Sequence, residues 1–279
     1  MTIAQLAHPI IQVLHIRTIS GRYRRGVVGD LIDIHNHLLP GVDDGCIDVN
    51  ESLELAAAMV EAGFSDVLCT PHIAPRLQHN NPREIVRGVS ELQELLDLAN
   101  VPLRVHAGGE NRVGAENIAL PIRKLNLAAS GQSRGGRFFL FDNWNTEWPH
   151  ELTPMLKRLT ADGITPILGH PERIPWVWDD PLATADRLSR LGCQLQLNAY
   201  VLTGPWHKPP VKVQAIMTET AKLLLENGRY DYAATDAHRP GAWPERREGL
   251  VALRELAGEA EFLRLFRDNP QQLLPPAHS

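Results

Sequence analysis

Seven short apolar runs, most of them separated by segments long enough to form a helix, constrain the fold of this 279-residue chain more than any other feature. Strands that alternate with helices pair in parallel through right-handed crossovers. We therefore expect an α/β fold, a distorted (β/α)7 barrel similar to a TIM barrel, with the active site at the carboxyl ends of the strands. The predicted strands cover residues 31–34, 66–70, 102–107, 137–141, 165–169, 194–197 and 232–235.

Helix signals occur between these strands. Asp48-Val49-Asn50-Glu51 resembles a capping box, and apolar residues at helical spacing follow it. Helices are also expected over residues 82–98 and near residues 149–160. An open doubly wound sheet is the alternative, but it gathers ligands at one switch point. Here polar residues end every predicted strand, and this pattern favours a ring.

Most of the predicted strands end in, or close to, a residue with an imidazole or carboxylate side chain. Two histidines two positions apart, His35 and His37, follow the first strand, and on a strand their side chains point the same way. Such groups without thiolates suit catalytic manganese, iron or zinc. The set exceeds the needs of one ion, so two or three divalent metals are expected. The predicted ligands are His35, His37, Asp44, His72, Glu110, Asp142, His170, Asp236 and His238.

Composition excludes several other classes of protein. The net charge of −5, without runs of like charge, argues against a nucleic-acid partner, and no apolar stretch is long enough for membrane insertion. The three cysteines are far apart and indicate a reducing compartment, so we expect a cytoplasmic protein. None is followed by arginine six residues later, as in cysteine-dependent phosphatases. No dinucleotide-binding or P-loop motif is present, and residues 130–136 have the composition of a surface loop.

The domain organisation is predicted to be simple. Residues 1–29 combine an apolar run with later arginines and are interpreted as an N-terminal extension, whereas residues 30–279 are expected to form a single barrel domain. Trp144, Trp148, Trp176 and Trp178 follow predicted ligand-bearing strands. They are either ordinary packing residues or the wall of a cleft that binds an aromatic group.

At the level of motifs, the chain resembles the polymerase-and-histidinol-phosphatase (PHP) superfamily from about residue 31 to residue 274. Within it, the sequence is most similar to the bacterial manganese-dependent tyrosine phosphatases of capsule and exopolysaccharide gene clusters. The resemblance rests on Asp-Ile-His-Asn-His with Val-Asp-Asp-Gly, Thr-Pro-His, Gly-Gly-Glu, Gly-His-Pro-Glu-Arg and Thr-Asp-Ala-His.

This resemblance implies a distribution of ligands among three metals. His35, His37, Glu110 and Asp236 would bind the first; Glu110, Asp142 and His170 the second; Asp44, His72 and His238 the third. Asp142 stands where the phosphatases commonly have glutamate. Trp243 occupies the position of a family arginine, so Arg173 is the expected phosphate ligand, with Arg239 and Arg246 as further candidates.

The resulting prediction is a metal-dependent phosphoesterase, in which a metal-bridging hydroxide attacks phosphorus while Arg173 neutralises the phosphoryl oxygens. His238 or a water would protonate the leaving phenolate. The expected substrate is a phosphotyrosine protein, a bacterial tyrosine kinase of polysaccharide export. Three alternatives remain: a small-metabolite phosphatase of the histidinol-phosphate type, a nuclease, and a non-catalytic PHP domain that binds a kinase partner.

Overall fold

All seven predicted strands are present in the computed structural model, which describes residues 29–74, 76–77, 79–113, 136–204 and 210–275. The predicted strands over residues 66–70 and 102–107 are each followed by a further short strand. Pro71, which cannot donate to a strand ladder, separates the first pair, and Gly108-Gly109 separates the second. The strands are β1 (Leu31–Asn36), β2 (Phe64–Cys69), β3 (His72–Ile73), β4 (Arg104–Ala107), β5 (Glu110–Arg112), β6 (Arg137–Asp142), β7 (Ile164–Gly169), β8 (Gln194–Asn198) and β9 (Tyr232–Ala234).

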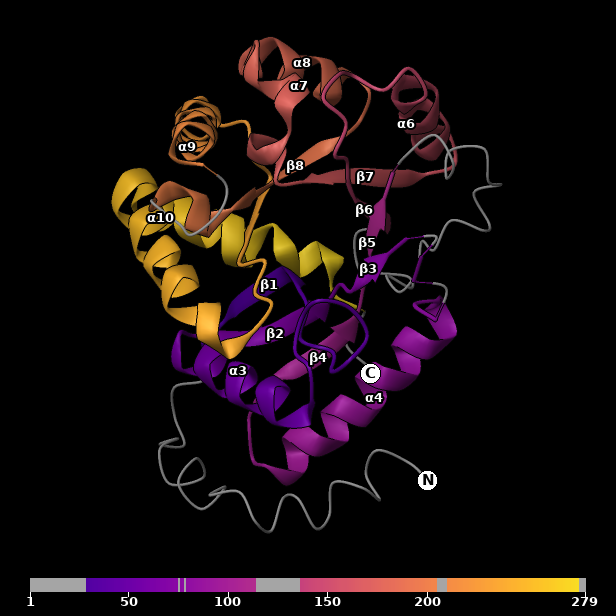
Figure 1. The fold of residues 1–279 in the computed structure, drawn as a ribbon, viewed down its shortest axis with the longest axis vertical. Helices are drawn as coiled ribbons and strands as arrows, with labels where there is room; N and C mark the ends of the chain where they lie inside the picture. The colour runs from indigo at the N-terminus through magenta and orange to yellow at the C-terminus, as the bar shows by residue number, and fades with distance from the viewer. Residues whose placement is uncertain (1–28, 75, 78, 114–135, 205–209, 276–279) are drawn as a thin grey trace.

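These strands form two parallel sheets (Figure 1). One has the order β1-β2-β4 and the other the order β3-β5-β6-β7-β8-β9. The last strand approaches the first through one isolated bridge between Asn36 and Ala237, where His37 N donates to Ala237 O at 2.8 Å. The prediction of an α/β fold with parallel strands is confirmed, whereas closure into a complete barrel stays a prediction.

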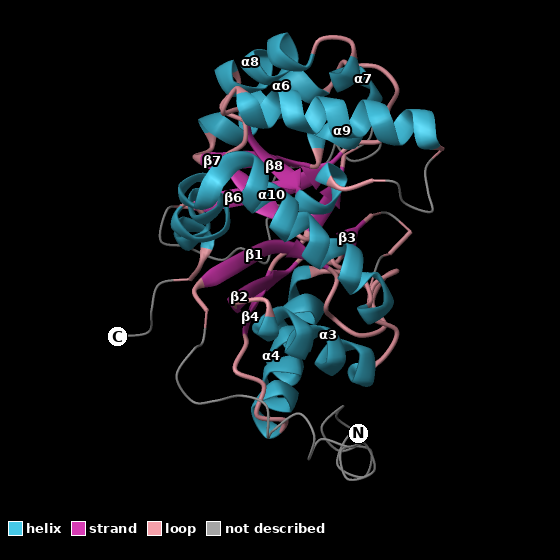
Figure 2. Ribbon diagram, turned by 90° about the vertical axis from the view of Figure 1, so that its left-hand side faces the viewer, coloured by secondary structure: helices cyan, strands magenta, loops and turns pink. Residues whose placement is uncertain are grey.

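Helices cover the sheets on their outer sides. Figure 2 shows α3 and α4 beneath the three-stranded sheet and α6 to α9 above the six-stranded one. Asp48 caps α3 by accepting from the N–H groups of Asn50 and Glu51, as its capping-box pattern predicts. The predicted range 82–98 matches α4. The helices are α3 (Val49–Glu61), α4 (Pro82–Leu98), α6 (Leu152–Ala161), α7 (Pro175–Trp178), α8 (Pro181–Arg190), α9 (Val211–Glu226) and α10 (Trp243–Leu263).

The core places charged residues of β1 in the interior. Ile32 and Ile34 pack with apolar residues of β6, β7 and β9, while Asp33 and His35 are fully buried. A buried carboxylate needs hydrogen bonds, and Asp33 accepts them from Thr235 N at 3.0 Å and Thr235 Oγ1 at 2.6 Å. These bonds fix β1 against the segment after β9. The carboxyl ends of the first and last strands therefore meet at one place.

Some expectations fall on residues outside the described ranges. The proposed extension over residues 1–29 and the predicted loop at residues 130–136 lie almost entirely there, so both stay predictions. Among the described residues, none of the helices combines the length and the apolar character needed to cross a bilayer.

Candidate metal centre

Eight of the nine predicted ligands converge at the carboxyl ends of the strands. Their nitrogen and oxygen atoms fall into three overlapping groups, and within each group these atoms lie within 4.8 Å of one another. Asp142 is the predicted ligand outside these groups. The groups are His37, Asp44, His72 and His238; His35, Glu110 and His170; and His35, His37 and Asp236.

His35 and His37 reach the centre from the end of β1. The register between β1 and β2 shifts between Asp33 and Asn36, and local irregularities of this kind redirect side chains near active sites. The two rings lie 5.7 Å apart between centroids. Nε2 of His35 is 3.6 Å and Nε2 of His37 is 3.4 Å from Oδ1 of Asp236. The structure therefore brings the two histidines together beside Asp236.

Glu110 lies at the middle of the centre. The parallel pairing of β3 and β5 sets it directly beside His72, whose Nδ1 is 2.6 Å from Oε2 of Glu110. Its other oxygen, Oε1, is 2.9 Å from Nε2 of His170 and 3.4 Å from Nε2 of His35. Because Glu110 is almost completely buried and contacts four imidazoles from three strand ends, it joins the groups to one another.

The pKa shifts of Glu110 and His72 show that positive charge stabilises the carboxylates of the centre. Burial raises the pKa of Glu110, but the His35 charge and hydrogen bonds from His170 and His72 outweigh it, so the pKa lies well below its usual value. Burial lowers the pKa of His72, yet its bonds to Asp44 and Glu110 raise it to about 11. The protein alone would balance these carboxylates with protonated imidazoles. Divalent cations would supply the same charge.

Hydrogen bonds orient three of the imidazoles. Nδ1 of His35 lies 2.8 Å from Oε1 of Gln196, and Nδ1 of His37 lies 2.7 Å from Oδ2 of Asp43. Nδ1 of His238 donates to the carbonyl of Asp236 at 2.9 Å. All three partners are acceptors, so in the neutral rings Nδ1 carries the proton and Nε2 has the lone pair that would face a cation. Metal-binding histidines are held in this way.

Several buried atoms of the centre have no hydrogen-bond partner in the described part of the chain. An unpaired buried polar atom is costly, and unpaired atoms gathered at one place indicate a missing ligand. The donor types are those that divalent transition metals prefer, so the residues fit the expected ions. These atoms include Nε2 of His35, Nε2 of His37, Nδ1 of His170 and Oδ1 of Asp142.

Backbone strain marks two of the predicted ligands. His170 has φ 39° and Asp236 has φ 50°, in the left-handed region that residues other than glycine seldom adopt. Such conformations cost about 1–3 kcal/mol each and persist where surrounding contacts enforce them. His170 N donates to Gln196 O and Asp236 N donates to His35 O, so hydrogen bonds to neighbouring strand ends hold both residues in place.

Asp142 ends β6 and is fully buried, but it faces different partners. Its Oδ2 accepts a hydrogen bond from Nε1 of Trp144 and lies 3.7 Å from Nη2 of Arg112. Burial and the nearby Glu110 charge raise its pKa to about 7. Its short side chain therefore stands at the edge of the centre, and its role as a metal ligand stays a prediction.

The Asp142→Asn variant should show how this carboxylate affects the stability of the fold, and no activity measurement is needed. Because the folded-state pKa is raised above 3.8, ionisation destabilises the metal-free fold as the pH rises from about 4 to about 7. At pH 8 the metal-free variant should be more stable than the wild type by a few kcal/mol, on the order of 1.4 kcal/mol per pKa unit. The difference should disappear near pH 4.

Urea denaturation at both pH values, with and without manganese, measures this effect. If Asp142 binds a metal, added manganese should stabilise the wild type more than the variant and reverse their order at pH 8. An Asn variant that gains as much stability from manganese as the wild type would place Asp142 outside the coordination sphere.

The three arginine candidates occupy different environments. Nη1 of Arg173 lies 2.9 Å from Oδ2 of Asp236, at the centre. Arg239 forms an exposed ion pair with Glu51 on the first turn of α3, which directs it away from the centre. Arg246 places its guanidinium 3.6 Å above the Tyr200 ring, and its Nε donates to Asp236 O at 3.3 Å. Trp243 begins α10 and is buried in the core.

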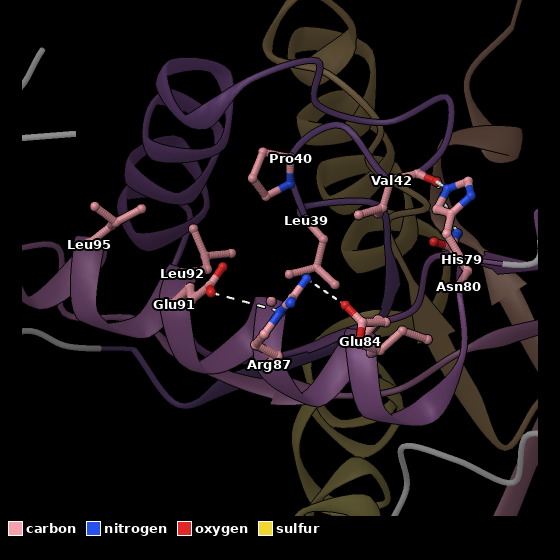
Figure 3. Close-up of a pocket in the computed structure, with 12 residues that line it drawn as sticks. Leu39, Pro40, Val42, His79, Asn80, Glu84, Arg87, Glu91, Leu92 and Leu95 are labelled. Carbon is pink, nitrogen blue, oxygen red and sulfur yellow. Dashed lines mark hydrogen bonds and ion pairs between the residues drawn. The ribbon is translucent and has the colours of Figure 1, made fainter. Parts of the chain in front are cut away.

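The loop that carries Asp44 is fixed by its neighbours. Asn80, which Figure 3 shows beside Val42, donates to Val42 O at 3.0 Å and to His72 O at 2.9 Å. These bonds connect the loop to β3. Asp43 accepts from the N–H of His72 at 2.9 Å. Asp44 itself is largely exposed and reaches Nε2 of His72 at 3.3 Å. A pocket of about 160 Å³ lies between this loop and α4, and Figure 3 shows residues that line it.

Asp43 and Gln196 were missed as residues of the site. Asp43 belongs to the Val-Asp-Asp-Gly motif, of which only Asp44 is among the predicted ligands. Gln196 lies two residues before Asn198 on β8, and the alternation of side chains along a strand places both on one side. Asn198 donates to Oδ2 of Asp236 at 2.8 Å. The spacing of Gln196 and Asn198 along the strand could have indicated that both face the site. Only the fold determines which residue each of them contacts.

Parallel sheets with imidazoles and carboxylates gathered at the strand ends define an α/β protein with a candidate centre for divalent metals. The family model for capsular polysaccharide synthesis proteins, CpsB/CapC, matches residues 31–275. The chain therefore belongs to the CpsB/CapC family.

Curated relatives agree with this membership. The chain is 27% identical to the tyrosine-protein phosphatase YwqE of Bacillus subtilis over 75% of this chain and 77% of that protein. It is 25% identical to the putative tyrosine-protein phosphatase CapC of Staphylococcus aureus, with 88% and 91% covered. It is 23% identical to the tyrosine-protein phosphatase CpsB of Streptococcus pneumoniae, with 88% and 98% covered.

A solved structure supports the same assignment. It comes from work on YwqE of Bacillus subtilis and CpsB of Streptococcus pneumoniae, described as unique metal-dependent tyrosine phosphatases. The match has a TM-score of 0.70 and 25% identity, and it covers 89% of this chain and all of that one. An inactive dihydroorotase-like domain of Chaetomium thermophilum, at 13% identity and a TM-score of 0.51, shares the fold alone.

Proposed function

We propose that this protein is a metal-dependent phosphatase that hydrolyses phosphotyrosine in a protein of polysaccharide synthesis. The observation that carries the proposal is the convergence of eight imidazoles and carboxylates in three overlapping groups with Arg173 beside them. The names of the relatives, tyrosine-protein phosphatases, supply the substrate class. We infer two or three ions, with manganese as the first choice and iron or zinc as alternatives.

The residues of this chain would have distinct roles in phosphate hydrolysis. When bound, the ions would polarise the phosphoryl group and activate a water for attack. Arg173 would neutralise phosphoryl oxygens, since its guanidinium is ionised at all relevant pH values and its partner Asp236 holds it at the centre. Arg246 is better placed than Arg239 to provide a second cation, because it contacts Asp236 whereas Arg239 is paired with Glu51.

His238 is better suited to hold a metal than to protonate the leaving group. Its Nδ1–H donates to a backbone carbonyl, so Nε2 offers a lone pair and no proton. Phenolate, with a reference pKa near 10, leaves with little acid assistance. An aryl ester therefore fits this centre better than an alkyl ester, and this distinguishes the proposal from a histidinol-phosphate type of phosphatase.

The proposal also includes the closure of the barrel, the cellular compartment and the partner protein. We infer a closed seven-stranded barrel within one domain over residues 30–279, preceded by an extension at residues 1–29, and the bonds between β1 and the segment after β9 support closure. We infer a cytoplasmic protein, since Cys46, Cys69 and Cys193 are free and buried. The inferred partner is the tyrosine kinase of polysaccharide export.

Chelation tests the proposed function. Dialysis against a chelator should remove hydrolysis of a phosphotyrosine peptide, and manganese should restore it, whereas thiol alkylation should have little effect because the three cysteines are buried. Histidinol phosphate, as the alkyl ester, should be hydrolysed more slowly. Activity that survives exhaustive chelation but is lost on alkylation would refute the proposal.

A further inference from the structure

Trp144 is the exposed tryptophan of the described residues, and it lies at the edge of the candidate metal centre. Its relative exposure is 62%, whereas Trp148, Trp176 and Trp178 are buried or half-buried against the core. It follows Asp142 by two residues, directly after β6. An aromatic side chain left in water at this position gives up much of the free energy that burial would provide.

The loop that carries Trp144 is fixed, although its indole is exposed. Asn143 is buried, donates to Val113 O at 2.9 Å and accepts from Nε1 of Trp176 at 3.0 Å and from Asn145 N at 3.1 Å. The backbone on both sides of Trp144 is therefore anchored. The indole of Trp144 is therefore exposed on a loop whose backbone is held by hydrogen bonds, which is not the case at a frayed loop tip.

Two polar contacts then fix the ring itself. The indole N–H donates to Asp142, and the Arg112 guanidinium lies 3.9 Å above the ring. Arg112 and Asp142 are paired in register on β5 and β6, so both contacts come from rigid strand ends. The ring is pre-ordered, and a ligand that stacked on it would not have to immobilise it.

We propose that Trp144, held by Arg112 and Asp142, is the platform for the aryl ring of the substrate and sets the preference for aryl phosphomonoesters. The inference rests on the proposed function. In an aryl phosphate the ring begins one ester oxygen from phosphorus. Trp144 is hydrogen-bonded to Asp142, which pairs in register with Arg112, two residues after Glu110 on β5. An aryl phosphate bound at the centre would therefore place its ring near Trp144, whereas an alkyl phosphate would have no ring to stack on Trp144.

Binding of two unreactive phosphonates separates ring recognition from phosphate recognition. Benzylphosphonate carries a ring and has CH₂ in place of the ester oxygen; methylphosphonate has no ring. Calorimetric titration of the manganese-loaded full chain should show tighter binding of benzylphosphonate. Trp144→Ala should weaken benzylphosphonate binding about three- to tenfold and leave methylphosphonate binding within about twofold, as the loss of one aromatic pair predicts.

A second variant distinguishes the ring from its N–H group. Trp144→Phe keeps an aromatic face but cannot donate to Asp142, so it should retain most of the benzylphosphonate preference. Leu98→Ala, at a similarly exposed apolar residue on α4, is the control and should change neither affinity. If Ala and Phe variants lose both phosphonates equally, Trp144 acts only by holding Asp142, and the inference is overturned.

Other results are equally decisive. An unchanged ratio of the two affinities in Trp144→Ala would also overturn the inference. In the wild type, benzylphosphonate should change the tryptophan fluorescence, and Trp144→Phe should abolish that change; this measurement does not depend on the Ala variant folding. A wild type that binds neither phosphonate would refute the phosphatase assignment itself.

Discussion

Glu110→Gln should abolish turnover and strip the centre of metal, even though the two side chains have nearly the same shape. Glu110 contacts His35, His72 and His170 at 2.6 to 3.4 Å, so its charge serves more than one of the three groups. Loss of several kcal/mol of Lewis-acid stabilisation corresponds to a rate at least about a thousandfold lower. Metal analysis should find fewer ions in the variant.

The matched control for this experiment is Glu51→Gln. It makes the same chemical change in a carboxylate that pairs with Arg239 at the surface. Its rate and metal content should equal those of the wild type. If Glu110→Gln kept both its metal and its rate, the central role of this carboxylate would be refuted.

Arg173→Ala should lower kcat/KM by about 10²- to 10³-fold, about 3–4 kcal/mol, while keeping the full metal content. The guanidinium faces Oδ2 of Asp236, and its removal leaves that carboxylate more negative, which does not weaken cation binding. His170→Ala should instead lose metal, because its ring contacts Glu110 at 2.9 Å. Metal analysis beside steady-state kinetics distinguishes the two roles.

Arg239→Ala provides the comparison among the arginines. Since Arg239 is engaged with Glu51, its removal should change the rate by less than about threefold, within the range of exposed ion pairs. Equal metal depletion in Arg173→Ala and His170→Ala would contradict the division into phosphate and metal residues.

The sequence predicted most of this arrangement, because the physics involved is local. The strands are set by short apolar runs, α3 by the side chain of Asp48, and eight predicted ligands by their positions at strand ends. The strand ends at Pro71 and at Gly108-Gly109 also follow from the residues themselves, whereas the short strands β3 and β5 beyond them were not predicted.

Long-range pairing explains what the sequence did not predict. The contacts of Asp142 depend on Arg112, thirty positions away, and those of His35 on Gln196, which is farther still. Spacing places Arg246 one helical turn after Trp243 on α10, but only the fold shows that it reaches Asp236 while Arg239 does not. Partners that come from different strands require the register of the sheets.

The meeting of β1 with the segment after β9 makes the centre a late product of synthesis and folding. His35 and Asp236 belong to one group of metal donors although two hundred residues separate them. Contacts this distant in sequence form slowly and after most of the chain is in place. A ribosome-bound fragment that ends before β9 would contain most of the helices but lack this pair, so tight metal uptake would report that the chain had been made beyond Asp236 and that this segment had docked on β1.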